Sequence, residues 1–209
     1  MISATRPLIY LISDGTITNE NFNARSDKLL SLVEAAVRTR IPLVQIREKQ
    51  LSTKKQLILA GRISAITRGS KTRVLINDRL DIALATGLDG IHLTSSSVGA
   101  DVIRGVVGKG FVIGASVHSS DELVRARATG ADLAVFAPIY ETPGKGRGVG
   151  VAILRDAVAT VAPFPVLALG GIDDSNYKSV IDAGAAGFAA IRFLNNAANL
   201  EKLSIEFGL

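Results

Sequence analysis

Residues 41–49 read IPLVQIREK, a short apolar run that ends in charged side chains. The segment after it carries Leu59, Ile63 and Ile66 at helical spacing, which predicts a helix with one buried face. The segment before it, Asp27 to Arg40, has apolar residues at the same spacing. The run therefore predicts a short strand between two helices, which is the repeating unit of a parallel α/β fold.

Eight such runs alternate with helix-like segments, and each ends in glycine or polar residues where a strand would pass into a loop. Eight strand–helix units are the number that closes a barrel without an exposed edge. We therefore expect an α/β fold, a single (β/α)8 TIM barrel, with one domain over residues 1–209. An open doubly wound sheet is the alternative, but no Gly-x-Gly-x-x-Gly motif opens a helix after the first run. The runs are Pro7–Asp14, Ile41–Lys49, Arg73–Arg79, Gly90–Ser95, Phe111–Ser119, Leu133–Thr142, Pro165–Ile172 and Gly187–Leu194.

The composition narrows the classes of partner. The chain has no cysteine, which excludes disulfides, thiolate catalysis and thiolate metal sites and is compatible with the cytoplasm that we predict as its location. The formal net charge is +5, but the basic residues are scattered, so phosphorylated small molecules fit better than nucleic acid. The apolar stretch from Leu8 to Ile12 is too short for a signal peptide or a membrane span.

Polar side chains end the second and third runs. Alternate residues of a strand share a face, so Gln45, Arg47 and Lys49 are expected to project together at the end where a barrel has its active site. Arg and Lys there would hold a diphosphate or another polyanion, and the alternative is a solvated strand end. Asn77 and Asp78 follow the third run. Asp78 is a candidate ligand for phosphate-bound Mg²⁺, although both residue types are also ordinary turn formers.

The fifth run places Ser116 and His118 two residues apart, again at a strand end. His118 is a candidate general acid–base, with a structural histidine as the alternative. His92 lies deeper in an apolar run, where a packed core role is expected. Immediately after the fifth run, Ser119 and Glu122 have the spacing of a capping box and predict a helix start.

Glycines end the seventh run. Gly170 and Gly171 are expected to bind phosphate through backbone N–H groups, together with the end of the eighth run at Ile191 and Arg192. A plain turn would need the same glycines. Lys145 lies in the glycine-rich stretch 144–150, where it would close over an anionic ligand or belong to a solvated loop.

These motifs in this order resemble the thiamine phosphate synthase and TenI family along nearly the whole chain. The matching features include Leu8–Asp14, the Gln-x-Arg-x-Lys of residues 45–49, Asn77-Asp78, Asp89–Leu93, Gly114–His118, Gly130–Asp132, Pro138–Tyr140 with Thr142 and Lys145, and Gly170–Ile172.

For a synthase, the resemblance implies that Gln45, Arg47 and Lys49 bind an aminopyrimidine diphosphate, with Asn77 nearby and Asp78 as a Mg²⁺ ligand. The thiazole nitrogen would capture a pyrimidine carbocation as pyrophosphate departs. Ser116 and Lys145 would lie near the departing group, and Thr142 would contact substrate. Gly171 and the eighth-strand loop, with Ile191 and Arg192, would hold the thiazole phosphate.

One departure from the synthase pattern decides our leading expectation. Synthases usually carry Gly-Gln-x-Asp after His92-Leu93, with the aspartate as second magnesium ligand, but here residues 94–97 read TSSS. A serine hydroxyl is a poor substitute for a carboxylate on Mg²⁺. The TenI-like branch resembles this chain at that place and catalyses thiazole tautomerisation.

We therefore predict a TenI-like thiazole tautomerase that needs no cofactor and uses His118 as general acid–base, with Ser116 and Lys145 as further catalytic residues. The first alternative is thiamine phosphate synthase with Mg²⁺, because Gln45 and Asp78 are intact. The second alternative is a non-catalytic regulator that binds a thiamine intermediate. The sequence makes no prediction of oligomeric state.

Overall fold

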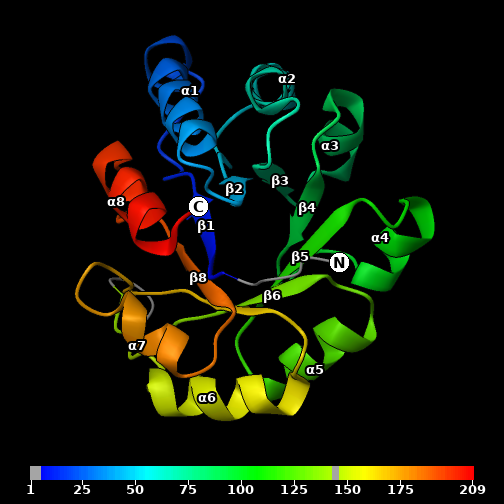
Figure 1. The fold of residues 1–209 in the computed structure, drawn as a ribbon. Helices are drawn as coiled ribbons and strands as arrows, with labels where there is room; N and C mark the ends of the chain where they lie inside the picture. Colours follow the sequence, from blue (N-terminus) through cyan, green and yellow to red (C-terminus); the bar gives the residue numbers. More distant parts are fainter. Residues whose placement is uncertain (1–5, 143–145) are drawn as a thin grey trace. The chain divides into compact units, whose positions relative to one another are not determined.

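The computed structural model describes residues 6–142 and 146–209 and confirms the predicted fold class. Within these ranges, eight strands alternate with eight helices, and the strands are hydrogen-bonded in chain order as a closed parallel barrel, a (β/α)8 TIM barrel (Figure 1). The strands are β1 (Leu8–Ile12), β2 (Leu43–Ile46), β3 (Arg73–Asn77), β4 (Gly90–Leu93), β5 (Val112–Val117), β6 (Leu133–Phe136), β7 (Val166–Ala168) and β8 (Gly187–Ala190). The helices are α1 (Phe22–Arg38), α2 (Thr53–Thr67), α3 (Leu80–Thr86), α4 (Ala100–Val106), α5 (Ser120–Ala128), α6 (Gly150–Val161), α7 (Tyr177–Asp182) and α8 (Ala197–Phe207).

The strands are buried on both faces, which is why their sequences are continuous apolar runs. All residues of β1, β2, β4, β6, β7 and β8 are buried. A parallel strand that lies beneath helices has no solvated face, so it needs no polar alternation. Each strand is shorter than the run that predicted it, because the polar residues that close each run belong to the loops.

The chain divides into two compact units, described in turn. The first unit comprises Tyr10–Ile91 and Ile191–Leu209. It contains α1, α2, α3 and α8, and α1 packs against both α2 and α8. Within it, Ile12 of β1 pairs with Gln45 of β2, and Ile46 of β2 pairs with Ile76 of β3. The ends of these strands therefore lie next to one another.

The second unit comprises His92–Ala190 with residues 6–9. It contains α4, α5, α6 and α7, together with the ladder from β5 to β8. Leu8 N donates to Ala186 O at 2.8 Å. A Cβ added to Gly187 would lie 1.9 Å from Leu8 O, so this position accepts only glycine.

The prediction that residues 1–209 form one domain stays a prediction.

Local hydrogen bonds explain where two helices begin. Ser119 caps α5, because its side chain accepts from Glu122 N at 3.2 Å, and this confirms the predicted helix start. The Glu122 carboxylate accepts from His118 N at 2.7 Å rather than from the capping residue. Helix α1 begins at Phe22, before the predicted Asp27, after a turn in which Thr18 N donates to the Asn21 side chain at 2.8 Å.

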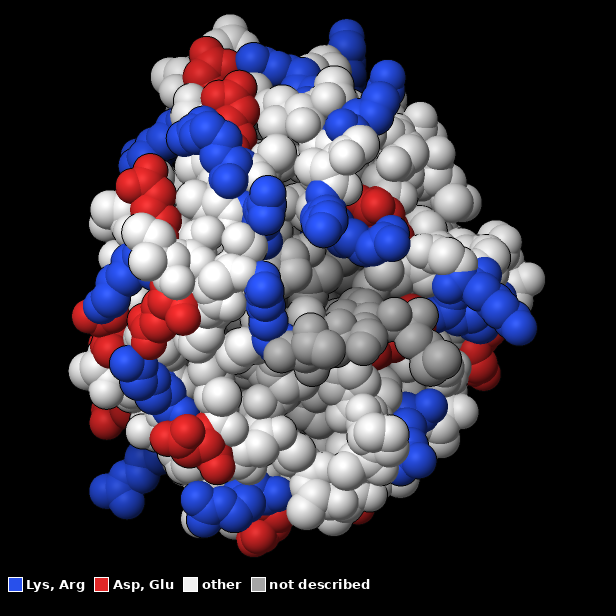
Figure 2. Space-filling view, in the orientation of Figure 1, with Lys and Arg blue, Asp and Glu red and all other residues white. Residues whose placement is uncertain are grey.

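The surface carries charges of both signs. Figure 2 shows basic and acidic side chains interspersed over the outer helices of the face in view. In the described ranges, no helix has the combination of length and apolar character that a bilayer crossing requires.

Candidate active site

The end of β2 carries the predicted cations. Gln45 is buried within the strand, which stops at Ile46, and Arg47 and Lys49 follow it. The expected alternation therefore does not reach Lys49. Lys49 lies in the turn after the strand and lines a pocket with Ile46 and Glu48 instead of sharing the face of Gln45. The reason is that side chains alternate only while the backbone is extended.

A pocket of about 210 Å³ joins the ends of β2 and β3. Lys49 contributes from the β2 side, and Asn77 and Asp78 contribute from the β3 side. The neighbouring Arg79 also lines it. The structure thus brings together three of the residues that the sequence singled out, within the first unit.

Arg47 and Lys49 differ from the neighbouring Arg79 in having no acidic partner among the described residues. Neither side chain has a hydrogen bond or ion pair with another described residue. Arg79, by contrast, is held at 2.6 Å by the carboxylate of Asp81, which raises the pKa of Arg79 and lowers that of Asp81. Uncompensated cations beside a pocket are suited to an anionic ligand.

Asp78 has an unusual backbone. Its φ is +45°, a left-handed conformation that is uncommon outside glycine, and such strain is found most often at functional sites. Asn77 Nδ2 lies 3.4 Å from Asp78 Oδ1. In the described part of the chain, no three carboxylate or imidazole groups gather as a metal cage. One exposed carboxylate beside a carboxamide offers oxygen ligands of the kind that Mg²⁺ prefers, so Asp78 would hold such an ion only with further oxygen ligands from water or a bound molecule.

Glu48 is the residue in this region that sequence reasoning missed. Its side chain is 4% exposed and accepts hydrogen bonds from Gly15 N at 3.1 Å and Ile17 N at 2.9 Å. Burial raises the pKa of the Glu48 carboxyl, and hydrogen bonds, first from Ser13, offset part of that rise. Glu48 therefore fixes the loop after β1 against the end of β2. The available signal was an acidic residue between the two predicted site cations, Arg47 and Lys49.

Ser116 and His118 occupy the end of β5 in the second unit. Ser116 is half-buried and His118 is exposed. His118 Nδ1 lies 2.7 Å from Ala137 O. Because a carbonyl oxygen only accepts, Nδ1 carries a proton and donates it. His92, predicted as a packed core residue, is buried, but its Nε2 lies 2.9 Å from Ser116 Oγ.

Gly170 and Gly171 follow β7 with φ of +105° and +65°. A Cβ at Gly170 would lie 2.8 Å from Pro138 Cα, and one at Gly171 would lie 2.7 Å from the Tyr140 Cβ. The glycines are thus required by the close approach of the loop after β6. Neither backbone N–H donates a hydrogen bond within the described residues, so both are available to a ligand.

The remaining predicted residues lie in three places. Thr142 Oγ1 donates to Tyr140 O at 3.1 Å, and Thr142 forms an isolated bridge with Gly146. Lys145 lies outside the described residues. Ile191 and Arg192 belong to the first unit, where Asn195 Nδ2 donates to both Ile191 O and Ile12 O at 2.7 Å.

The serines in the loop after β4 have a structural role, because they form hydrogen bonds within that loop. Thr94 N donates to Ser97 Oγ at 2.9 Å, and Thr94 Oγ1 lies 3.0 Å from the same atom. Ser96 Oγ is 3.1 Å from Thr94 Oγ1. The hydroxyl groups therefore close a turn around one another.

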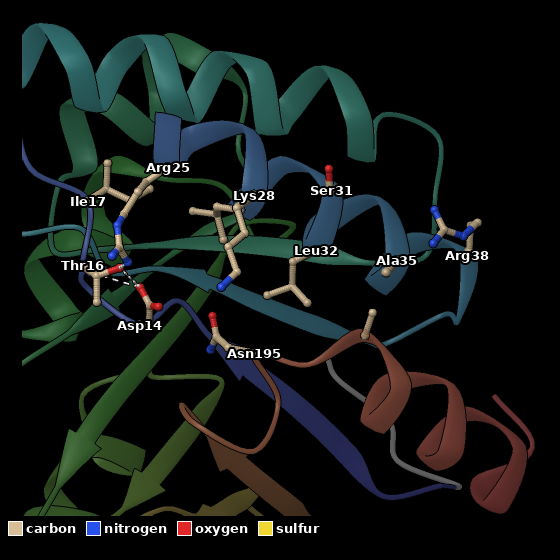
Figure 3. A pocket seen from close by; sticks show the side chains of 12 residues that line it. Asp14, Thr16, Ile17, Arg25, Lys28, Ser31, Leu32, Ala35, Arg38 and Asn195 are labelled. Atoms are coloured by element: carbon tan, nitrogen blue, oxygen red, sulfur yellow. Dashed lines mark hydrogen bonds between the residues drawn. The ribbon is translucent and has the colours of Figure 1, made fainter. Parts of the chain in front are cut away.

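A separate pocket of about 340 Å³ lies along α1 in the first unit, lined by Lys28, Leu32, Arg38 and the loop after β1 (Figure 3). In that loop, Thr16 Oγ1 donates to Asp14 at 2.7 Å and accepts from Arg25 at 3.0 Å. The residues that line it include none of the predicted site residues, so Arg38 is a suitable control for the predicted site cations.

Known proteins resemble the chain over most of its length. Residues 10–194 match the model of a family described as thiamine monophosphate synthase. A protein of Geobacter sulfurreducens named putative thiamine-phosphate synthase is 41% identical over 186 residues, covering 88% of this chain and 84% of that protein. A thiamine-phosphate synthase of Methanoculleus marisnigri is 37% identical, with coverages of 88% and 85%. One from Thermosynechococcus vestitus is 40% identical, and the chain spans 52% of its length.

A solved structure agrees with these sequences. The thiamine phosphate pyrophosphorylase from Pyrococcus furiosus superposes with a TM-score of 0.78 at 26% identity, covering 95% of both chains.

The prediction of a TenI-like thiazole tautomerase is wrong, because relatives up to 41% identical carry the name thiamine-phosphate synthase. That prediction depended on Ser97 in place of an aspartate. The Ser97 hydroxyl closes a local turn with Thr94, so a serine there has a structural reason that is independent of the reaction.

Proposed function

The chain belongs to the thiamine monophosphate synthase family, and on this premise we propose that it joins an aminopyrimidine diphosphate to a thiazole phosphate with release of pyrophosphate. Family membership makes it an enzyme, which replaces the alternative of a non-catalytic regulator. The observation that carries the proposal is that Lys49, a cation without an acidic partner among the described residues, lines one pocket with Asn77 and Asp78, while Arg47, also without such a partner, follows the same strand.

The proposed reaction exchanges one bond for another. The bond between the pyrimidine methylene carbon and the diphosphate oxygen breaks, and its electron pair leaves with pyrophosphate. The thiazole ring nitrogen supplies the pair that forms the new carbon–nitrogen bond. Negative charge grows on the departing group, so Arg47 and Lys49 stabilise it more strongly as the bond breaks.

The neighbouring polar groups would orient the first substrate. Gln45, with its buried carboxamide, and Asn77 offer donors and acceptors to the aminopyrimidine ring. Asp78 would hold Mg²⁺, which supplies further charge neutralisation to the diphosphate.

The second substrate would bind through its phosphate. Gly170 and Gly171 each offer an N–H group without an acceptor among the described residues. Successive N–H groups in left-handed turns form a concave anion site, which suits a phosphate monoester. Ile191 and Arg192 of the first unit stay candidate substrate-binding residues, and Ser116, Thr142 and Lys145 stay candidate contacts of the reacting groups.

One assay tests the proposal on the purified chain. Aminopyrimidine diphosphate and thiazole phosphate are incubated with Mg²⁺, and pyrophosphate and thiamine phosphate are measured together. We expect equal amounts of both products, and their loss when EDTA removes the metal. A protein that is folded by circular dichroism but forms neither product would exclude synthase activity.

A further inference from the structure

The second unit contains a buried imidazole that the proposed reaction does not use. His92 of β4 is 2% exposed, and its Nε2 lies 2.9 Å from Ser116 Oγ of β5. In the described part of the chain, the Ser116 hydroxyl has no hydrogen-bond partner besides this ring. The Ser116 hydroxyl therefore keeps unused capacity for a second bond.

The direction of this hydrogen bond decides what Ser116 can do. A serine hydroxyl has one proton and two lone pairs. If His92 Nε2 accepts, the only proton of Ser116 is consumed, and the hydroxyl can only accept from a further group. If Nε2–H donates, the serine proton stays free to point elsewhere, and Ser116 becomes a donor.

An anionic phosphate oxygen has only lone pairs to offer. It can be bound by Ser116 only when the serine donates, which requires the proton of His92 to be on Nε2. We infer that His92 is a positioning residue that donates from Nε2 to Ser116 and so makes the Ser116 hydroxyl a donor to an anionic oxygen of a phosphorylated substrate. This inference rests on the proposed function, because it takes the anionic substrate from it.

The other histidine of the chain has the opposite arrangement. His118 Nδ1 donates to Ala137 O at 2.7 Å, so the neutral ring carries its proton on Nδ1. The chain has only two histidines. We therefore expect the neutral rings of His92 and His118 to be different tautomers, which NMR spectroscopy can distinguish.

Long-range proton–nitrogen NMR of histidine-labelled protein reads the two tautomers directly. We expect the His118 ring to be protonated on Nδ1 and the His92 ring on Nε2, with His118→Gln used to assign the signals. A His92 ring protonated on Nδ1 would overturn the inference. Because this measurement needs no substrate, it judges His92 even if the chain proves inactive as a synthase.

A double-mutant cycle tests whether His92 acts through Ser116. His92→Leu should lower kcat/KM about 10-fold to about 100-fold, the range for a hydrogen bond to a charged group. In a Ser116→Ala background, His92→Leu should cause no further loss. His92→Gln, which can keep a donor at the Nε2 position, should restore most of the activity.

Thermal unfolding and the double-mutant cycle together separate this role from packing alone. Thermal unfolding of each variant shows whether a loss of activity follows a loss of folded protein. Equal losses from His92→Leu in the wild-type and Ser116→Ala backgrounds would contradict the inference. A wild-type enzyme without synthase activity but with the expected tautomers would instead remove the proposed function and leave the His92–Ser116 bond standing.

Discussion

The two units carry their candidate binding groups in different chemical forms. In the first unit these groups are the charged side chains of Arg47, Lys49 and Asp78 at the ends of neighbouring strands. In the second unit they are hydroxyl, imidazole and backbone N–H groups at Ser116, His118 and the glycine pair after β7. Charged side chains attract a polyanion, whereas neutral donors must point at it. Anion binding in the first unit is therefore expected to depend on the identity of its charged side chains. In the second unit it is expected to depend on the conformation of the backbone.

The largest loss of activity is expected when an unpaired cation of the first unit is removed. Arg47→Ala should lower kcat/KM by about 100-fold to about 1,000-fold, because it removes an unpaired cation from the departing diphosphate. Steady-state kinetics with varied aminopyrimidine diphosphate measures this. Arg38→Ala, which removes an exposed arginine at the end of α1, is the matched control and should leave the rate unchanged. Equal losses in the two variants would show that general charge, rather than position, matters.

Backbone geometry in the second unit is tested by adding one methyl group. Gly171→Ala should destabilise the protein by about 2–4 kcal/mol, because it places a Cβ 2.7 Å from the Tyr140 Cβ at a left-handed φ. Urea unfolding gives the difference. Gly105→Ala, in α4 with no atom within 4 Å of the added Cβ, should instead stabilise by about 0.5–1 kcal/mol. If both variants were neutral, the glycine pair would not be needed for the loop contact.

The smallest effect is a pH dependence within the first unit. Burial raises the pKa of Glu48 above its ordinary value of 4.5. The native state therefore binds this proton more tightly than the unfolded state, so the contribution of Glu48 to stability is full below that ordinary value and falls as pH rises through the raised pKa.

Thermal unfolding from about pH 4 to about pH 8 measures this dependence. The stability of the wild-type protein relative to Glu48→Gln should decrease as pH rises. Glu34→Gln, an exposed substitution on α1, controls for the change of charge. A difference between wild type and Glu48→Gln that is constant or increases with pH would contradict the role of burial.

The fold was predictable because barrel strands leave a plain signal. Each strand is a short apolar run that is closed by glycine or polar residues, and all eight were found. Their ends were placed too far along, since residues such as Arg47 and Asp78 belong to the loops. A sequence shows the change from apolar to polar residues, but the last ladder hydrogen bond is set by neighbouring strands.

Candidate site residues could be named from the sequence where residue type carries the chemistry. Arg47 and Lys49 were named because two cations at a strand end suit an anionic ligand, and their role stays a prediction. Glu48 was missed, because its role depends on Gly15, 33 residues away. His92 is buried as predicted, but its contact with Ser116, 24 residues away, could not be read from the sequence. The reaction was misjudged from Ser97, since a single serine was given more weight than the intact remainder of the pattern.

The hydrogen bond of Asn195 to Ile12 shows that the first unit is completed only by the end of the chain, which bears on folding during synthesis. It ties the turn after β8 to Ile12, in a unit that also contains Gln45, Arg47 and Lys49. On a ribosome, Tyr10–Ile91 emerges first but waits through the synthesis of the whole segment His92–Ala190 for the partner that completes it. The nascent chain thus presents Arg47 and Lys49, the cations proposed to bind diphosphate, before the first unit is complete. A chaperone that shields residues 10–91 would therefore act while residues 92–190 are being synthesised.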